Sequence, residues 1–125
     1  MSIEDRFNSL EWHDSYIEKI VLEPAGPGDE WGRAFLAIEW PSNSKDVVGF
    51  EKCYEFQSNL SLMVFRPVVL AGECKAESVQ ISESKDRWFK AGLELPSLRR
   101  FRFETNFGEI EIHATEFYLR ARDQQ

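Results

Sequence analysis

Residues 99–120 read RRFRFETNFGEIEIHATEFYLR, and two alternating runs within this stretch decide the fold class. Phe101 and Phe103 alternate with charged residues, and Ile110 and Ile112 do the same a few residues later. A period of two is typical of strands that bury one face. We therefore predict an antiparallel hairpin in which Phe103 lies opposite Ile110 and Phe101 lies opposite Ile112, because a slip of one residue would turn every Phe to water.

The same register predicts the partners on the polar face of the hairpin. Arg102 would face Glu111, and Arg100 would face His113, which we expect to be solvated. Cross-strand pairs of this kind contribute about 0.2–1 kcal/mol each. The polar face is thus expected to carry a ladder of charges.

Further strands are predicted upstream. The segments 15–23 and 33–40 are rich in β-branched and apolar residues, and each ends in a loop signal containing proline. From 50 to 66 the large apolar residues occupy even positions, which predicts either one long bent strand or two strands joined by an even-length turn. Residues 77–82 predict another short strand.

Two short helices complete the prediction. Ser2 is placed to cap a helix with Ile3, Phe7 and Leu10 on one face, and residues 84–92 could form a second helix. The whole chain, 1–125, is expected to be a single domain. Its class would be mainly β, an antiparallel sandwich or a strongly curved sheet of six to seven strands with one or two short helices.

Composition limits the classes of protein. Hydrophobic residues make up 42% of the chain, which is too much for a disordered protein. The first ten residues lack the features of a signal peptide, and no run approaches the 18 or so apolar residues of a membrane span. Cys53 and Cys74 form no CxxC motif. We expect a cytoplasmic protein with two reduced thiols and no membrane association.

The negative charge is distributed unevenly. Residues 1–62 hold 12 acidic and 5 basic residues, whereas residues 63–125 hold 10 of each, so the first half carries the entire net charge of −7. Such a field disfavours nucleic acid and would favour a basic partner. It also keeps a domain soluble, which is the more general reason for a net charge.

The stretch Trp12-His13-Asp14 contains one of the two histidines of the chain. Asp14 is suited to hydrogen-bond backbone amides where a strand begins, and His13 to contact a neighbouring carbonyl or carboxylate. We therefore interpret Trp12, His13 and Asp14 as a structural motif. No constellation of residues is expected to be catalytic, and no cofactor is expected.

The alternative is a metal-binding protein or hydrolase centred on His13, Asp14 and His113, with Glu111 as a further ligand. Two imidazoles and carboxylates suit zinc or iron. A hydrolase of the Ser-His-Asp type would need a serine on a sharp turn, and the GxSxG motif is missing from the sequence. Spacing alone therefore does not require this site.

A basic patch is a second alternative for the C-terminal half. Its members would be Lys85, Arg87, Lys90, Arg99, Arg100 and Arg102. The three arginines lie in register with Glu109, Glu111 and Glu116, which predicts ion pairs instead of a nucleic-acid surface.

The stretch LEWHDSYIEKI (10–20) is similar to the opening of small bacterial β-rich proteins of unknown function. The similar positions are a hydrophobic residue, His-Asp, a small residue and spaced isoleucines; here they are Trp12, His13, Asp14, Ser15, Ile17 and Ile20. GEIEIHATEF (108–117) resembles their closing strand. Some of these proteins are grouped with immunity proteins of polymorphic toxin systems. The resemblance implies a bacterial cytoplasmic domain that binds a protein and catalyses no reaction.

These observations together predict a non-enzymatic protein-binding domain, and the resemblance implies an immunity-type inhibitor of a toxin. Its partner surface would include Asp29, Glu30 and Trp31, with Trp31 as an aromatic anchor in an acidic loop. Trp31 could equally cover one end of the core, since most tryptophans are largely buried. An edge strand could also join copies of the chain into a homo-oligomer.

Overall fold

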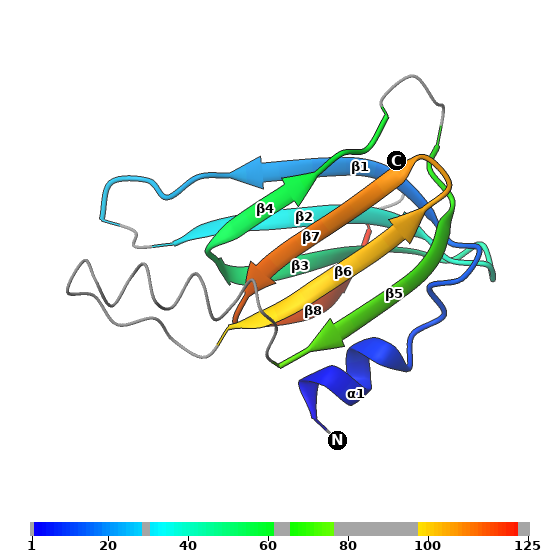
Figure 1. Cartoon of the computed structure of the whole chain (residues 1–125), viewed down its shortest axis with the longest axis horizontal. Coiled ribbons are helices and arrows are strands. Elements are labelled where there is room, and N and C mark those ends of the chain that lie inside the picture. The colour runs from blue at the N-terminus through cyan, green and yellow to red at the C-terminus, as the bar shows by residue number, and fades with distance from the viewer. Residues whose placement is uncertain (1, 29–30, 62–65, 77–97, 123–125) are drawn as a thin grey trace.

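A computed structural model describes residues 2–28, 31–61, 66–76 and 98–122. Within these residues, two antiparallel four-stranded sheets pack face to face (Figure 1). The prediction of a mainly β sandwich is confirmed, although the described residues form eight strands where six or seven were expected. The predicted strand 77–82 and the predicted helix 84–92 lie outside the described residues.

The first sheet has the strand order β1-β2-β3-β8. Its strands are β1 (Tyr16–Glu23), β2 (Gly32–Glu39), β3 (Lys45–Cys53) and β8 (Glu116–Ala121). β1 contains a bulge between Ile17 and Lys19, which shifts the alternation by one residue. Ile17 and Ile20 therefore both point toward the core although they are three residues apart.

The second sheet has the strand order β4-β7-β6-β5. Its strands are β4 (Glu55–Ser58), β5 (Val69–Lys75), β6 (Arg99–Thr105) and β7 (Gly108–Ala114). The predicted hairpin is confirmed in β6 and β7: Phe103 pairs with Ile110 and Phe101 with Ile112. All four of these side chains are fully buried between the sheets.

The large apolar residues at even positions from residue 50 onward belong to two strands in different sheets. Lys52, the next-to-last residue of β3, has a φ of 49° in the left-handed region, and β4 begins at Glu55 in the opposite sheet. Phe50 and Phe56 both reach the core from these two sides. The break within the predicted run falls at Tyr54, between the two strands, and Leu62 and Val64 lie outside the described residues.

The short helix α1 (Ile3–Asn8) covers one end of the sandwich, beside β5 (Figure 1). Its predicted cap is confirmed, because the Asp5 amide donates to Ser2 Oγ at 3.0 Å. Phe7 is fully buried, and Ile3 and Leu10 pack against the same core. The ring of Phe7 contacts four aromatic rings from other parts of the chain, those of Trp12, Phe101, Phe103 and Phe117. The helix therefore completes the core that both sheets share.

Candidate binding face on the first sheet

The stretch that contains His13 and Asp14 joins β1 to the segment before β5. Four hydrogen bonds connect residues 13–17 with residues 67–70. They are His13 Nδ1 with Leu70 O (3.0 Å), Asp14 N with Val69 O (2.9 Å), Val69 N with Ser15 O (2.8 Å) and Ile17 N with Pro67 O (3.0 Å). β1 is in the first sheet and β5 in the second, so these bonds tie the two sheets together along one edge.

Asp14 contributes mainly through its backbone. Its φ is 67°, a left-handed conformation that Asp, Asn and Gly adopt at lower cost than other residues. Its side chain is 69% exposed, and within the described part of the chain it contacts His13 at 3.6 Å. The expected bond from its carboxylate to a strand amide is not present among the described residues.

We expect Asp14→Asn and Asp14→Gly to change the free energy of unfolding by less than about 0.5 kcal/mol, while Asp14→Val lowers it by about 1–2 kcal/mol. The reason is that Asn and Gly tolerate the positive φ and a β-branched residue does not. Urea unfolding of the three variants measures the difference. An Asn variant as unstable as the Val variant would show that the carboxylate itself is needed.

The two histidines lie far from each other. His13 contacts Leu70 of β5. The neighbouring Val69 pairs with Thr105 at one end of β6. His113 pairs with Arg100 at the other end of β6. Four to five residues of strand separate these positions by about 15 Å. Within the described ranges, no group of three or more His, Cys, Asp or Glu side chains is placed to hold a metal ion. The geometry does not bring His13, Asp14 and His113 together.

His113 differs from the expectation of a solvated side chain. It pairs with Arg100 as predicted, but its side chain is only 1% exposed. Its Nε2 lies 3.0 Å from Glu111, and its Nδ1 lies 3.4 Å from Glu55 at an angle too poor for a hydrogen bond. Arg100 also pairs with Glu111. His113 is therefore part of a covered polar cluster on the outer side of the second sheet.

The register is as predicted, with Arg102 opposite Glu111 and Arg100 opposite His113, but the arginines of β6 form their ion pairs with other carboxylates. Arg100 contacts Glu111, Arg102 contacts Glu109 and Glu104, and Arg99 contacts Glu4 of the helix at 2.7 Å. Lys85, Arg87 and Lys90 lie outside the described residues. Each of the three arginines is thus paired with a neighbouring carboxylate, and none of the three side chains is more than 26% exposed.

The predicted partner loop is described only in part. Asp29 and Glu30 lie outside the described residues. Trp31 is half-buried, and its ring lies edge-on to that of Tyr54 with the centroids 6.4 Å apart. Trp31 thus packs against Tyr54 where β2 and β4 begin.

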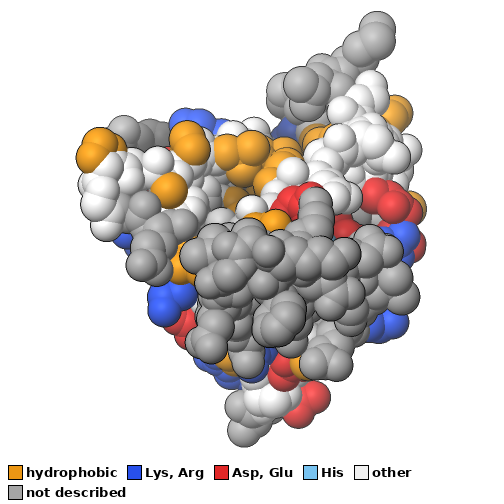
Figure 2. Space-filling view, turned by 60° about the vertical axis from the view of Figure 1, so that its left-hand side comes forward, with side chains coloured by type: hydrophobic (Ala, Val, Ile, Leu, Met, Phe, Trp, Pro, Cys, Tyr) orange, Lys and Arg blue, Asp and Glu red, His pale blue; other side chains and the backbone are white. Residues whose placement is uncertain are grey.

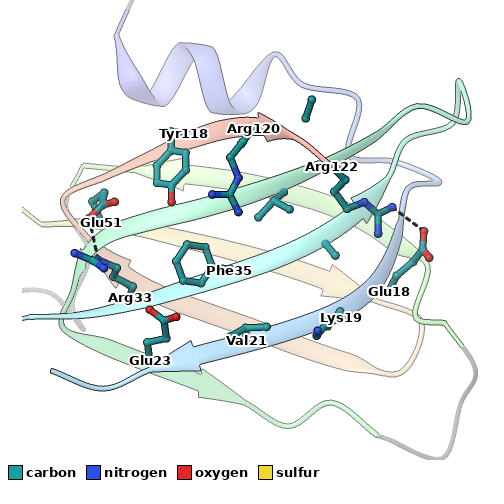
Figure 3. A pocket seen from close by; sticks show the side chains of 13 residues that line it. Glu18, Lys19, Val21, Glu23, Arg33, Phe35, Glu51, Tyr118, Arg120 and Arg122 are labelled. Atoms are coloured by element: carbon teal, nitrogen blue, oxygen red, sulfur yellow. Dashed lines mark hydrogen bonds and ion pairs between the residues drawn. The ribbon is translucent and has the colours of Figure 1, made fainter. Parts of the chain in front are cut away.

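A hollow of about 1080 Å³ lies on the outer side of the first sheet. We call it the outer hollow. All four strands of the sheet contribute side chains to it (Figure 3). They are Glu18, Lys19, Val21, Glu23, Arg33, Phe35, Ala37, Val47, Glu51, Tyr118, Arg120, Ala121 and Arg122.

An apolar row crosses the middle of the outer hollow. Val21, Phe35, Gly49 and Tyr118 pair in register across β1, β2, β3 and β8, and we call them the aromatic row. A Cβ at Gly49 would overlap the Tyr118 ring, so glycine is what allows this ring to lie across β3. Phe35 and Tyr118 are both half-buried although they lie on the solvent side of the sheet.

A second row lies two residues along each strand from the aromatic row and carries two basic side chains. Lys19, Ala37, Val47 and Arg120 pair in register, and we call them the cationic row. Lys19 and Arg120 are exposed, and within the described chain neither has an ion-pair partner. Ala37 and Val47 between them leave a low, apolar floor. Figure 3 shows Arg120 reaching from β8 over the neighbouring strand.

The two ends of the outer hollow differ in charge. Arg33 pairs with Glu51 at 3.7 Å at one end, where Glu23 also lies. At the other end Arg122 donates to Glu18 at 3.0 Å, beside the cationic row (Figure 3). The lining as a whole has four basic and three acidic residues, so the acidic excess of the first half of the sequence is not concentrated here. On the face in Figure 2, too, acidic and basic side chains are mixed.

Glu18 is the centre of the ion pairs at the basic end. The hydrogen bond from Arg122 lowers the pKa of its carboxyl, with smaller contributions from the charges of Lys45 and Arg66, while burial acts in the opposite direction. Lys45 lies 3.8 Å and Arg66 4.0 Å from Glu18 Oε1. These contacts join β1, β3 and β8 across the sheet.

We expect Glu18→Gln to remove part of the acid sensitivity of the protein. Because the folded-state pKa of Glu18 is below its ordinary value of 4.5, its ion pairs add stability above that pH and lose it as the pH falls through the lowered pKa. The free energy of unfolding of the variant should be lower than that of wild type by up to about 1 kcal/mol near pH 7, and this difference should disappear near pH 2. Urea unfolding at several pH values measures it. The control is Glu23→Gln, which removes an exposed carboxylate of the same strand that makes no ion pair among the described residues, and its stability near pH 7 should equal that of wild type.

No local sequence pattern indicates the outer hollow directly. Phe35, Lys19 and Arg120 are single residues in alternating strands, and the face that a strand exposes depends on the sheet against which it packs. Val21 is on this face only because of the bulge in β1. The available signal was Phe35 itself, a large aromatic residue at a position that alternates with the buried Ala34, Leu36 and Ile38.

Within the described residues, no helix is both long and apolar enough to cross a membrane. No protein-family model, curated protein or solved structure matches the chain. The outer hollow and its rows are therefore the features from which a function must be argued.

Proposed function

We propose that the protein is a non-enzymatic protein-binding domain and that the outer hollow is its binding surface. The observation that carries this proposal is the aromatic row on the solvent side of the first sheet. An outward sheet face without a partner is usually polar. Phe35 and Tyr118 are instead placed as the rigid aromatic residues that contribute most to protein interfaces.

The surroundings of the aromatic row have the layout of an interface. Charged residues frame an apolar centre, as a polar rim frames the core of a protein–protein contact. The lining contains no serine, threonine, cysteine or histidine. Its potential nucleophiles are Lys19, Tyr118 and three glutamates, and two of these glutamates, Glu18 and Glu51, are held in ion pairs. Both features support binding over catalysis at this face.

The class of partner to test first is a bacterial toxin. The resemblance of residues 10–20 and 108–117 to proteins grouped with toxin immunity proteins motivates it. A growth assay tests this part of the proposal: cells that produce the product of an adjacent toxin-like reading frame should grow with the wild-type protein and stop growing with Phe35→Ala/Tyr118→Ala. Equal rescue by both proteins would contradict the assignment of the outer hollow.

Binding as such is tested by selection from a display library that combines random linear peptides with randomised small helical scaffolds. The bait is the wild-type protein, and binders to Phe35→Ala/Tyr118→Ala are removed. We expect sequences that bind wild type and not the double variant. If no sequence depends on these two aromatic residues, the proposed function is wrong.

A further inference from the structure

We infer that the outer hollow binds a protein segment in which an acidic residue lies close to a large apolar residue. This inference rests on the proposed function and specifies the chemistry of the partner. The apolar side chain would contact the aromatic row, and the carboxylate would lie between Lys19 and Arg120 of the cationic row.

The first argument is the state of the charges in the hollow. Arg33, Arg122, Glu18 and Glu51 already have partners within the lining. Lys19 and Arg120 do not have one in the described part of the chain, and they flank the same apolar floor. Each strand spacing is about 4.8 Å, so their Cα atoms are about 14 Å apart and both long side chains can reach a carboxylate bound between them. Two cations without partners at one end favour an anionic group there.

The second argument is the distance between the two rows. Lys19 and Val21 are two residues apart on β1, so the cationic and aromatic rows are separated by about 7 Å. Two residues of an extended segment span about 6.6 Å, and four residues of a helix span about 6 Å. The partner should therefore carry its acid two to four residues from its apolar side chain.

The shape of the surface argues against a second copy of this chain as the occupant. Two hollowed faces cannot fill one another, whereas a single strand or helix fits into one. A nucleic acid is also disfavoured, because Glu18, Glu23 and Glu51 lie in the hollow and the chain has a net charge of −7. A partner that is basic overall can still present an acidic segment here, since long-range attraction and local contacts are separate effects.

The sequences recovered by the display selection test the inference. We expect Asp or Glu within four residues of a large apolar residue, and an affinity for Lys19→Ala/Arg120→Ala at least tenfold below that for wild type. Lys75→Ala, which removes an exposed lysine from the second sheet, is the matched control and should bind like wild type.

The other outcomes are distinct. Binders that depend on Phe35 and Tyr118 but carry Lys or Arg in place of the acid would overturn this inference and leave the proposed function standing. Equal binding by Lys19→Ala/Arg120→Ala would do the same. Two further results would also overturn the inference. One is a dimer, seen by light scattering, that is lost in Phe35→Ala/Tyr118→Ala. The other is binding of oligothymidylate that requires Lys19 and Arg120. Absence of any binder that depends on the aromatic residues would contradict both proposals.

Discussion

Replacement of Phe7 by alanine should lower the free energy of unfolding by about 3–5 kcal/mol, the range for removing a buried phenylalanine. The side chain is fully buried, and its ring centroid lies 4.7–5.6 Å from those of four other aromatic residues. These partners come from both sheets and from the segment after α1. The substitution would leave a cavity where the helix and the two sheets meet, and urea unfolding measures its cost.

Phe107→Ala is the matched control for Phe7→Ala. Phe107 lies in the turn between β6 and β7 and is 42% exposed, so its loss should cost less than about 1 kcal/mol. A similar small loss for Phe7→Ala would show that α1 is not part of the core. Such a result would contradict the arrangement at this end of the sandwich.

The double variant Phe35→Ala/Tyr118→Ala should lose at least about 100-fold in affinity for a binder of the outer hollow. Central aromatic residues of interfaces often cost 2 kcal/mol or more each when truncated, and 2.7 kcal/mol corresponds to about 100-fold. Both side chains are half-buried and lie on the solvent side of the sheet. The affinity of a peptide from the display selection can be measured by calorimetry.

The melting temperature of the double variant shows whether it has lost binding alone or also its folded structure. Core residues such as Leu36 and Val48 lie on the opposite side of the first sheet and keep their contacts. The melting temperature should therefore fall much less than in Phe7→Ala. Phe107→Ala, which removes an exposed aromatic residue elsewhere, should bind like wild type. If it weakens binding as much as the double variant does, the outer hollow is not the site.

The hairpin of β6 and β7 could be predicted from the sequence because both runs alternate and the turn between them has two residues. Thr105 pairs with Gly108, and every apolar residue of both runs then faces the core. Other strands lacked this signal. In β5, Ala71, Gly72 and Glu73 interrupt the apolar pattern, and a shift in register follows Val69. The strand exists because it pairs with β6, which the sequence alone does not show.

The candidate sites were harder to predict than the strands. Alternation placed His113 on the polar face of its strand, and it is indeed opposite Arg100, but tertiary packing buries it. The outer hollow depends on which strands become neighbours: residues 19, 37, 47 and 120 form one row only after β8 pairs with β3. No local pattern records that pairing. The structural interpretation of His13 and Asp14 rests on side-chain capacity, but of the four bonds to residues 67–70 only that of His13 uses a side chain, and Asp14 takes part through its backbone.

Backbone NMR of the protein with a selected peptide is the decisive experiment for the outer hollow, because it maps the binding surface without substituting any residue. We expect the largest chemical-shift changes on β1, β2, β3 and β8, at Lys19, Phe35, Gly49, Tyr118 and Arg120. Changes centred on His13 and Asp14, or on the loop before Trp31, with the outer hollow unaffected, would contradict it.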